Sequence, residues 1–139
     1  MTDERVTLGG ILRAARTIAV VGMSPRPTRP SHFVAEYLQR AGYRIVPVRP
    51  GVDSILGETA YPDLRSAAIA AGPLDVVDIF RRSEMIAELA DALLEVRPRL
   101  VWMQVGVRDD VTAARLESAG IPVVMDRCLM EDHPWLTSD

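Results

Sequence analysis

Five arginine residues are the groups in this sequence whose types and positions most suggest binding chemistry. Each stands shortly after a short apolar run with the composition of a β-strand: Arg26, Arg29, Arg49, Arg81 and Arg82. A guanidinium group offers paired N–H donors that fit a phosphate group. All 16 basic residues of the 139-residue chain are arginines, so their positions carry this argument and their abundance does not. In a chain with a net charge of −3, such a gathering predicts a small polyanionic ligand.

The loop after the first apolar run departs from the usual dinucleotide-binding pattern. That pattern requires G-x-G-x-x-G after the first strand, whereas this loop reads GMSPRPTRPSHF and keeps only Gly22. The second strand of an NAD site usually ends in an acidic residue that binds the ribose, and this chain has Arg49 there. Both observations disfavour NAD and favour an adenosine with a 2′- or 3′-phosphate. Free amides at a helix start near Ser31 would add phosphate donors.

The elements that must position these residues alternate between two kinds of pattern. Continuous apolar runs, typical of parallel strands covered on both faces, occupy residues 17–22, 44–48, 76–80, 100–105 and 122–125. Helical patterns occupy residues 7–16, 31–41, 64–71, 84–96 and 109–119. This alternation predicts an α/β fold with a Rossmann-like, doubly wound, parallel five-stranded sheet. We expect one domain over residues 1–139, with a lead-in helix in 1–16, a tail in 134–139 and strand order 3-2-1-4-5.

In sheets of this kind, ligands bind beyond the carboxyl ends of the strands. The residues that follow the first four expected strands therefore form the candidate site: Gly22, Met23, Ser24, Pro25, Arg26 and Pro27, then Arg49, Pro50 and Gly51, then Phe80, Arg81 and Arg82, and finally Gln104, Val105 and Gly106. Structural alternatives stay open at this point. Gly22 and Ser24 can serve a tight turn, the arginines can be solvated, and Gln104 can satisfy backbone groups.

Five segments in order resemble a known family, the small bacterial and archaeal CoA-binding proteins. Those proteins are similar to the N-terminal CoA-binding domain of the succinyl-CoA ligase alpha subunit. The segments read IAVVGMSPRPTRPSHFVAEYLQRAGYRIVPVRPG, ILGETAYPDL, DVVDIFRRSE, VWMQVGV and VVMDRCLMEDH. They extend over residues 17–133, which is nearly the whole chain.

The resemblance implies a domain that binds coenzyme A through its 3′-phosphate, pyrophosphate and adenine. It assigns residues 22–27 to the CoA phosphates, and it places Val48, Arg49 and Pro50 near the adenosine. It matches Phe80, Arg81 and Arg82 to the third-strand motif, and Met103, Gln104 and Gly106 to the fourth. Many relatives have asparagine where Arg49 stands, which leaves the contact made by this loop open.

The sequence contains no nucleophile, base and orienting group at a suggestive spacing. His32 and His133 do not resemble the phosphorylated histidine of the ligases in context. We expect His32 to be solvent-facing or structural, with donation to a phosphate as the alternative, and His133 to pack or to cap a helix. We expect Cys128 to be a buried, inert cysteine, and the alternative is a reactive thiol that exchanges disulfides with the thiol of CoA. The expected function is binding of CoA or an acyl-CoA without catalysis. Two alternatives are a component of an acyl-CoA ligase-like enzyme whose catalytic domains lie on a separate chain, and an NADP-binding oxidoreductase or sensor.

Composition argues against several other classes of protein. The negative net charge disfavours nucleic-acid binding. No apolar stretch approaches the roughly 20 residues that span a bilayer, and the first residues do not resemble a signal peptide. One cysteine allows no internal disulfide and, with two histidines, disfavours a zinc site, so we expect no metal and a cytoplasmic location. A homodimer or a protein partner stays open.

Overall fold

The computed structural model describes residues 4–138, so the outermost parts of the expected domain, residues 1–3 and 139, lie outside the described residues. Its main sheet contains five strands, all parallel: β1 (Thr17–Val21), β2 (Arg44–Val48), β5 (Val76–Ile79), β6 (Leu100–Met103) and β7 (Val123–Val124). Each expected apolar run supplies one strand. The predicted α/β class and five-stranded parallel sheet are therefore confirmed.

The predicted strand order 3-2-1-4-5 is wrong. The observed order is β2-β1-β5-β6-β7, which is 2-1-3-4-5 when the five expected strands are numbered along the chain. β2 therefore forms an edge of the sheet, and β1 pairs with both β2 and β5. Pro47 gives the physical reason, because proline has no N–H and is confined to sheet edges. The carbonyl of Pro47 accepts a hydrogen bond from Tyr61 N on the outer side (3.0 Å), while Val48 O accepts from Gly22 N on the side of β1 (2.9 Å). The nitrogen of Pro47, which has no hydrogen to donate, therefore faces away from β1, on the same side as the Pro47 carbonyl.

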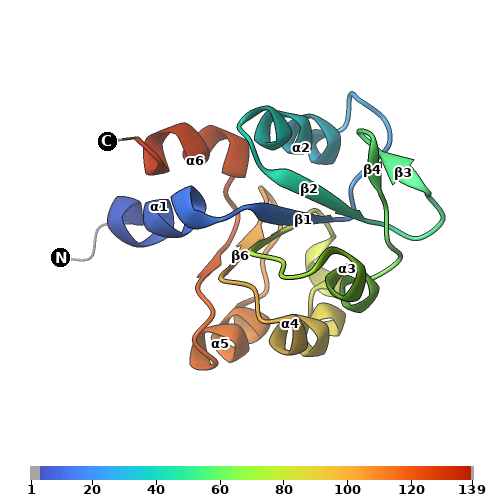
Figure 1. The fold of residues 1–139 in the computed structure, drawn as a ribbon. Helices are drawn as coiled ribbons and strands as arrows, with labels where there is room; N and C mark the ends of the chain where they lie inside the picture. Colours follow the sequence, from blue (N-terminus) through green and yellow to red (C-terminus); the bar gives the residue numbers. More distant parts are fainter. Residues whose placement is uncertain (1–3, 139) are drawn as a thin grey trace.

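Within residues 4–138, six α-helices cover the two faces of the sheet, as Figure 1 shows. The helices α1 (Glu4–Ala14), α2 (Pro30–Arg40) and α6 (Leu129–Leu136) lie on one face, and α3 (Leu64–Ala71), α4 (Ala90–Val96) and α5 (Asp110–Ser118) lie on the other. A two-stranded antiparallel hairpin, β3 (Ser54–Ile55) and β4 (Glu58–Thr59), follows β2 and has no counterpart among the expected elements. No helix in residues 4–138 has the length and apolar composition needed to cross a bilayer.

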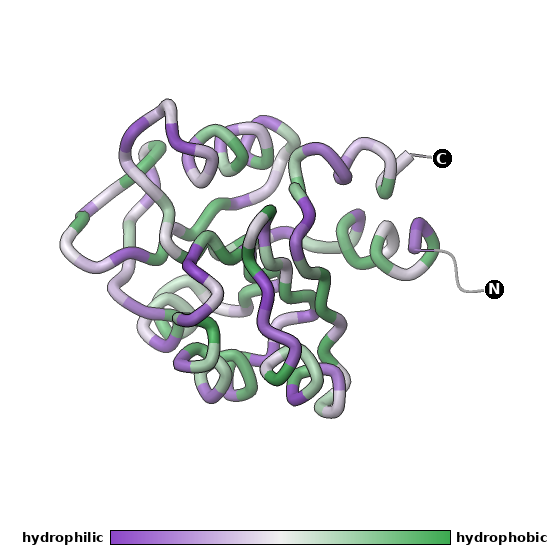
Figure 2. Tube along the Cα trace, turned by 180° about the vertical axis from the view of Figure 1, so that it is seen from behind, coloured by the Kyte–Doolittle hydropathy of each residue, from purple (hydrophilic) through white to green (hydrophobic). Residues whose placement is uncertain are grey.

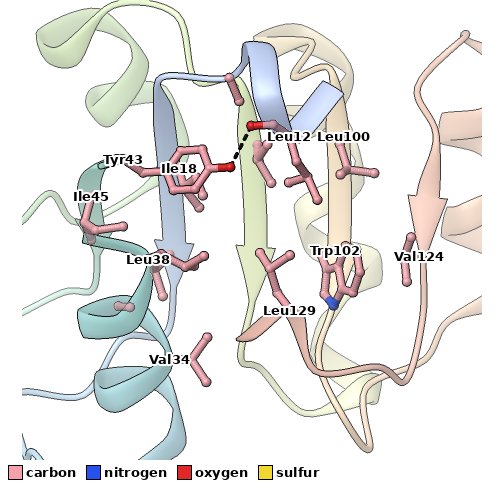
Figure 3. Close-up of a cluster of buried hydrophobic side chains, with 14 of the residues drawn as sticks. Leu12, Ile18, Val34, Leu38, Tyr43, Ile45, Leu100, Trp102, Val124 and Leu129 are labelled. Carbon is pink, nitrogen blue, oxygen red and sulfur yellow. Dashed lines mark hydrogen bonds between the residues drawn. The ribbon is translucent and has the colours of Figure 1, made fainter. Parts of the chain in front are cut away.

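Alternate side chains of each strand enter two separate apolar layers. Ile18, Val76 and Trp102 pack beneath α1, α2 and α6, whereas Val77 and Val101 pack beneath α3, α4 and α5. Because both faces are covered, the strands read as continuous apolar runs, and Figure 2 shows these runs gathered in the middle of the molecule. Figure 3 shows the first layer, in which the Tyr43 hydroxyl donates to the carbonyl of Leu12 (2.6 Å).

Two helical regions differ from expectation. The single helix expected over residues 84–96 is replaced by two 3₁₀ segments, Ser83–Met85 and Ala87–Leu89, followed by α4. The hydroxyl group of Ser83 bonds to the loop after β6: it accepts a hydrogen bond from Arg108 N (2.9 Å) and donates to Gly106 O (3.3 Å). Part of the expected tail, through Leu136, is the end of α6.

α6 is anchored to the rest of the fold through His133. The Tyr43 hydroxyl gives its proton to Leu12 O, so His133 Nε2 must donate to the Tyr43 oxygen (2.9 Å), and His133 Nδ1 then accepts from the Tyr37 hydroxyl (2.9 Å). Burial lowers the pKa of His133, which agrees with the neutral ring that this arrangement requires. The network joins α6 to α1, α2 and the start of β2.

Asp78 is the one side chain in residues 4–138 that is fully buried with two carboxyl oxygens lacking any hydrogen-bond partner. It lies on β5 between Val20 of β1 and Trp102 of β6. Loss of hydration raises the pKa of Asp78 well above its ordinary value of 3.8, because burial disfavours the charged form. The folded protein therefore holds Asp78 as a neutral carboxylic acid at pH values where the unfolded chain has released that proton.

Replacement of Asp78 by asparagine should change how stability depends on pH. Above about pH 4 the folded state binds a proton that the unfolded state has lost, so this group lowers wild-type stability as pH rises, by up to about 1.4 kcal/mol per pH unit. The amide of the Asp78→Asn variant does not titrate, so the free energy of unfolding of this variant minus that of wild type should increase from about pH 4 toward neutrality. Urea denaturation at several pH values measures this difference, and a difference independent of pH would contradict the account.

Candidate functional site

A cleft of about 1090 Å³ lies at the carboxyl ends of the strands. We call it the carboxyl-edge cleft. Eleven of the residues predicted to form the site line it: Gly22, Ser24, Pro25, Arg26, Arg49, Phe80, Arg81, Arg82, Gln104, Val105 and Gly106. They come from the ends of β1, β2, β5 and β6, which the parallel sheet brings to a single edge. The cleft thus gathers residues that are more than 80 positions apart in the chain.

The first loop is held in place by hydrogen bonds within it. Ser24 N donates to the Ser31 hydroxyl oxygen (2.9 Å), and Arg26 N donates to the Ser24 hydroxyl oxygen (3.1 Å). His32 Nδ1 donates to the carbonyl of Ser24 (2.9 Å), because a carbonyl oxygen can only accept. The buried His32 therefore has the structural role expected of it, as a support for this loop.

Gly22 permits both the turn and a close approach of two strand ends. Its φ of 81° lies in the left-handed region, and a Cβ at this position would lie 2.5 Å from the carbonyl oxygen of Phe80. Any side chain would clash with the backbone there. The tight-turn interpretation of Gly22 thus has direct structural support, and its lining of the cleft leaves a ligand contact open as well.

The first turn of α2 opens into the same cleft. Its N-cap residue is Arg29, whose side chain makes no capping hydrogen bond, and Pro30 follows at the first helical position. Arg29, Pro30 and Ser31 all line the cleft. Pro30 has no N–H, and His32 N and Phe33 N both donate to Arg29 O (2.9 and 3.1 Å). Among the described residues, only Ser31 N of this first turn is therefore left to meet an anion, which the positive end of the helix favours.

The five arginines that line the cleft have little acidic compensation. Arg81 lies 3.5 Å from Glu88 and Arg82 lies 3.6 Å from Glu84, and both pairs are exposed enough to be weak. Arg26 and Arg29 form no ion pair within residues 4–138. Arg49 donates from NH1 to the carbonyl of Met23 (3.2 Å), which holds its guanidinium over the first loop. The cleft is therefore an electropositive region in a protein of net negative charge.

A smaller pocket of about 550 Å³ adjoins the cleft on the side of α3. Val48 and Pro50, two further predicted residues, line it together with Gly22, Arg49, Phe80 and Arg81, which also line the main cleft. The two hollows thus share the residues at the ends of β1, β2 and β5.

Four predicted residues lie outside both hollows. Met23 and Met103 are completely buried in the apolar layers, whereas Pro27 and Gly51 are exposed. The structure also adds residues that did not belong to the predicted set: Phe33, Val34, Val107, Cys128, Met130 and Glu131. The last three come from the start of α6, a helix that the sequence patterns did not indicate. Cys128 is partly exposed, so its expected burial is wrong.

Gln104 satisfies a backbone group and also faces the cleft. Its side-chain oxygen accepts a hydrogen bond from Leu129 N in the first turn of α6 (3.1 Å). A backbone N–H can only donate, so this bond fixes which end of the amide is oxygen. The side-chain nitrogen donates to no group within residues 4–138. The structural alternative considered for Gln104 therefore holds for one half of its amide.

Groups suited to bond-breaking chemistry are not assembled in the described part of the cleft. His32 is the histidine nearest to its serines, and its Nδ1 is already bonded to the Ser24 carbonyl. His133 lies buried against Tyr37 and Tyr43. Residues 4–138 contain no group of three His, Cys, Asp or Glu side chains placed to hold a metal ion. The cleft therefore combines arginine side chains with apolar lining residues.

Two known proteins are similar to this chain over most of its length. The chain is 40% identical to the uncharacterized protein YneT of Bacillus subtilis over 123 residues, which cover 88% of this chain and 89% of YneT. A solved structure from Thermus thermophilus (cell-free ID.343) is 39% identical, with a TM-score of 0.90 and coverage of 97% of this chain and 99% of that chain.

An acetyl-coenzyme A synthetase from Ca. Korarchaeum cryptofilum shares the fold. It has a TM-score of 0.68 and 20% identity over 84% of this chain and 27% of its own. The profile of the CoA binding domain family matches residues 16–134. With the parallel sheet and the site at its carboxyl edge, this match shows that the chain belongs to the CoA binding domain family.

Proposed function

We propose that this protein binds coenzyme A or an acyl-CoA in the carboxyl-edge cleft, through the phosphates and adenosine, and catalyses no reaction by itself. The observation that carries this proposal is the set of five arginines around one cleft in a chain of net charge −3. CoA brings a pyrophosphate and a 3′-phosphate, so it supplies negative charge that the two weak contacts of Arg81 and Arg82 provide only in part within the described residues. Membership of the CoA binding domain family supports the same ligand.

Arg49 distinguishes CoA from NAD in this proposal. Its guanidinium lies at the end of β2, where NAD-binding sheets usually place a carboxylate for the ribose hydroxyls. NH1 is used by the Met23 carbonyl, so the other N–H groups of the guanidinium are available to a ligand phosphate. A phosphorylated ribose fits this arrangement better than a free one.

Binding without catalysis agrees with the chemistry of the lining. The acetyl-coenzyme A synthetase that shares this fold is a far longer chain, of which the present chain covers 27%. If this protein takes part in a ligase-like reaction, the catalytic groups must lie outside the described residues. A protein partner of that kind would be found by co-purification, and binding of CoA to the isolated protein tests the central proposal without it.

Replacing Arg81 and Arg82 should weaken CoA binding. Loss of a hydrogen bond to a charged group costs about 1.5–3 kcal/mol, so the dissociation constant of Arg81→Ala/Arg82→Ala should rise about tenfold or more. The side chain of Arg81 is 32% exposed and that of Arg82 is 82% exposed, so the single Arg81→Ala change should account for most of the loss. Calorimetric titration with CoA at two salt concentrations measures the affinity and its dependence on salt, which should also decrease.

A matched control removes the same charge elsewhere. Arg40→Ala/Arg115→Ala changes two exposed arginines on α2 and α5 that do not line the cleft. This control should retain wild-type affinity for CoA. Equal affinities for the two double variants would remove Arg81 and Arg82 from the site.

The proposal also predicts which ligands the protein prefers. CoA and acetyl-CoA should raise the melting temperature, because a ligand that binds only the native state stabilises it. 3′-Dephospho-CoA should bind at least several-fold more weakly than CoA, since it lacks one charged partner. Thermal denaturation with each ligand and with NAD, NADP and ATP at one concentration measures this order. Stabilisation by NADP with none by CoA would favour the oxidoreductase or sensor alternative.

A further inference from the structure

The carboxyl-edge cleft has a second end whose chemistry differs from that of the arginine end. The loop after β6 and the first turn of α6 form it, with the side chains of Val105, Val107, Cys128, Met130 and Glu131. None of the five arginines belongs to this end, and Glu131 carries a negative charge that repels phosphate. This end, which we call the α6 end, therefore suits an uncharged and partly apolar segment of a ligand.

Gln104 provides an unused hydrogen-bond donor at the α6 end. The residue is 4% exposed and lines the cleft, and its oxygen is occupied by Leu129 N. Its amide nitrogen has no acceptor within residues 4–138. The nitrogen itself is not among the buried atoms without a partner, so it is open to the cleft, and the carbonyl oxygen of a bound ligand can accept its hydrogen bond.

Cys128 lies directly before the residue that fixes the Gln104 amide. It is partly exposed, it lines the cleft, and it is the single cysteine of the chain. Its thiol makes no capping hydrogen bond to α6. A thiol and an amide donor thus occupy neighbouring positions at the α6 end.

The width of the sheet relates this end to the phosphates. Three strand spacings separate β2 from β6 in the order β2-β1-β5-β6-β7, which corresponds to about 14 Å. The extended pantetheine arm of CoA has a comparable length, contains amide carbonyls and ends in a thiol. With its phosphates among the arginines, the arm can reach Gln104 with a carbonyl and Cys128 with its sulfur.

We propose, on the basis of the proposed function, that Cys128 forms a reversible mixed disulfide with CoA and that Gln104 Nε2 directs the pantetheine arm to it. The oxidant is CoA disulfide. The Cys128 thiol loses its proton to solvent, and Sγ attacks one sulfur of the CoA disulfide. A bond forms between Sγ and that sulfur, the bond between the two CoA sulfurs breaks, and the second CoA leaves as a thiolate with the electron pair. Excess free thiol reverses the step.

The test compares two disulfides with the reduced wild-type protein. Intact-mass spectrometry follows the rate of adduct formation with CoA disulfide and with 2-hydroxyethyl disulfide, which has no phosphate or pantetheine group. Recognition in the cleft should make the reaction with CoA disulfide faster by about tenfold or more, because bound CoA raises the local concentration of the disulfide. The ratio of the two rates reports recognition, since any change in the reactivity of the thiol affects both.

Two variants test the proposed roles. Gln104→Glu keeps an oxygen for Leu129 N and removes the donor, and it should lower the rate ratio. Arg81→Ala/Arg82→Ala should lower it as well, whereas Arg40→Ala/Arg115→Ala should not. Cys128→Ser should give no adduct with either disulfide.

Calorimetry with reduced CoA separates failure of this inference from failure of the proposed function. If CoA binds and the rate ratio is near one, or no adduct forms, the assignment of Cys128 is wrong and the binding function stands. If CoA does not bind, both fail. A high ratio that Gln104→Glu leaves unchanged would overturn the role of Gln104.

Discussion

The pairing of β1 with a parallel neighbour on each side is the constraint on which the site depends. The chain leaves β1 toward α2 on one face of the sheet, and it leaves β5 toward α4 on the other face. Connections that leave in opposite directions cannot cover the gap between these strand ends, and a cleft results. The gap is narrow at its base, where Gly22 approaches the Phe80 carbonyl too closely for any Cβ. The same pairing thus opens the cleft and requires glycine at its floor.

The electrostatics of the cleft follow from this geometry. Arginines that lie far apart in the sequence follow the strands, so the parallel arrangement brings their charges to one edge, where two weak and exposed acidic contacts offset them. The first loop is already fixed by hydrogen bonds among Ser24, Ser31 and His32, so little backbone order remains to be gained on binding. An anion would relieve the repulsion among the cations. The α6 end of the same cleft offers a thiol, an amide donor and apolar contacts in place of arginines.

α6 links the stability of the fold to the shape of the cleft. Its C-terminal half is anchored by His133 between two tyrosines, and its first turn is held by the Gln104 oxygen. α1 packs against it so closely that a Cβ on Gly9 would lie 2.1 Å from Leu136 O. A helix fixed at both ends places Cys128 and Met130 reproducibly in the wall of the cleft. Its position depends on partners from α1, α2 and β6, which lie far away in the sequence.

The sequence by itself determined the fold class, the approximate position of each main strand and the gathering of arginines at one edge. Continuous apolar runs report burial on both faces wherever the strand lies in the sheet, and the end of a parallel strand is a topological position. Strand order was not determined, because the apolar composition of a strand does not identify its neighbours, and only the structure showed that the strand with Pro47 forms an edge. Tertiary structure alone decided that Met23 and Met103 point into the core, that Gln104 presents its nitrogen to the cleft, and that α6 forms a wall. The physical reason is that each of these features depends on contacts with residues far away in the sequence. The local pattern of polar and apolar residues does not identify those residues.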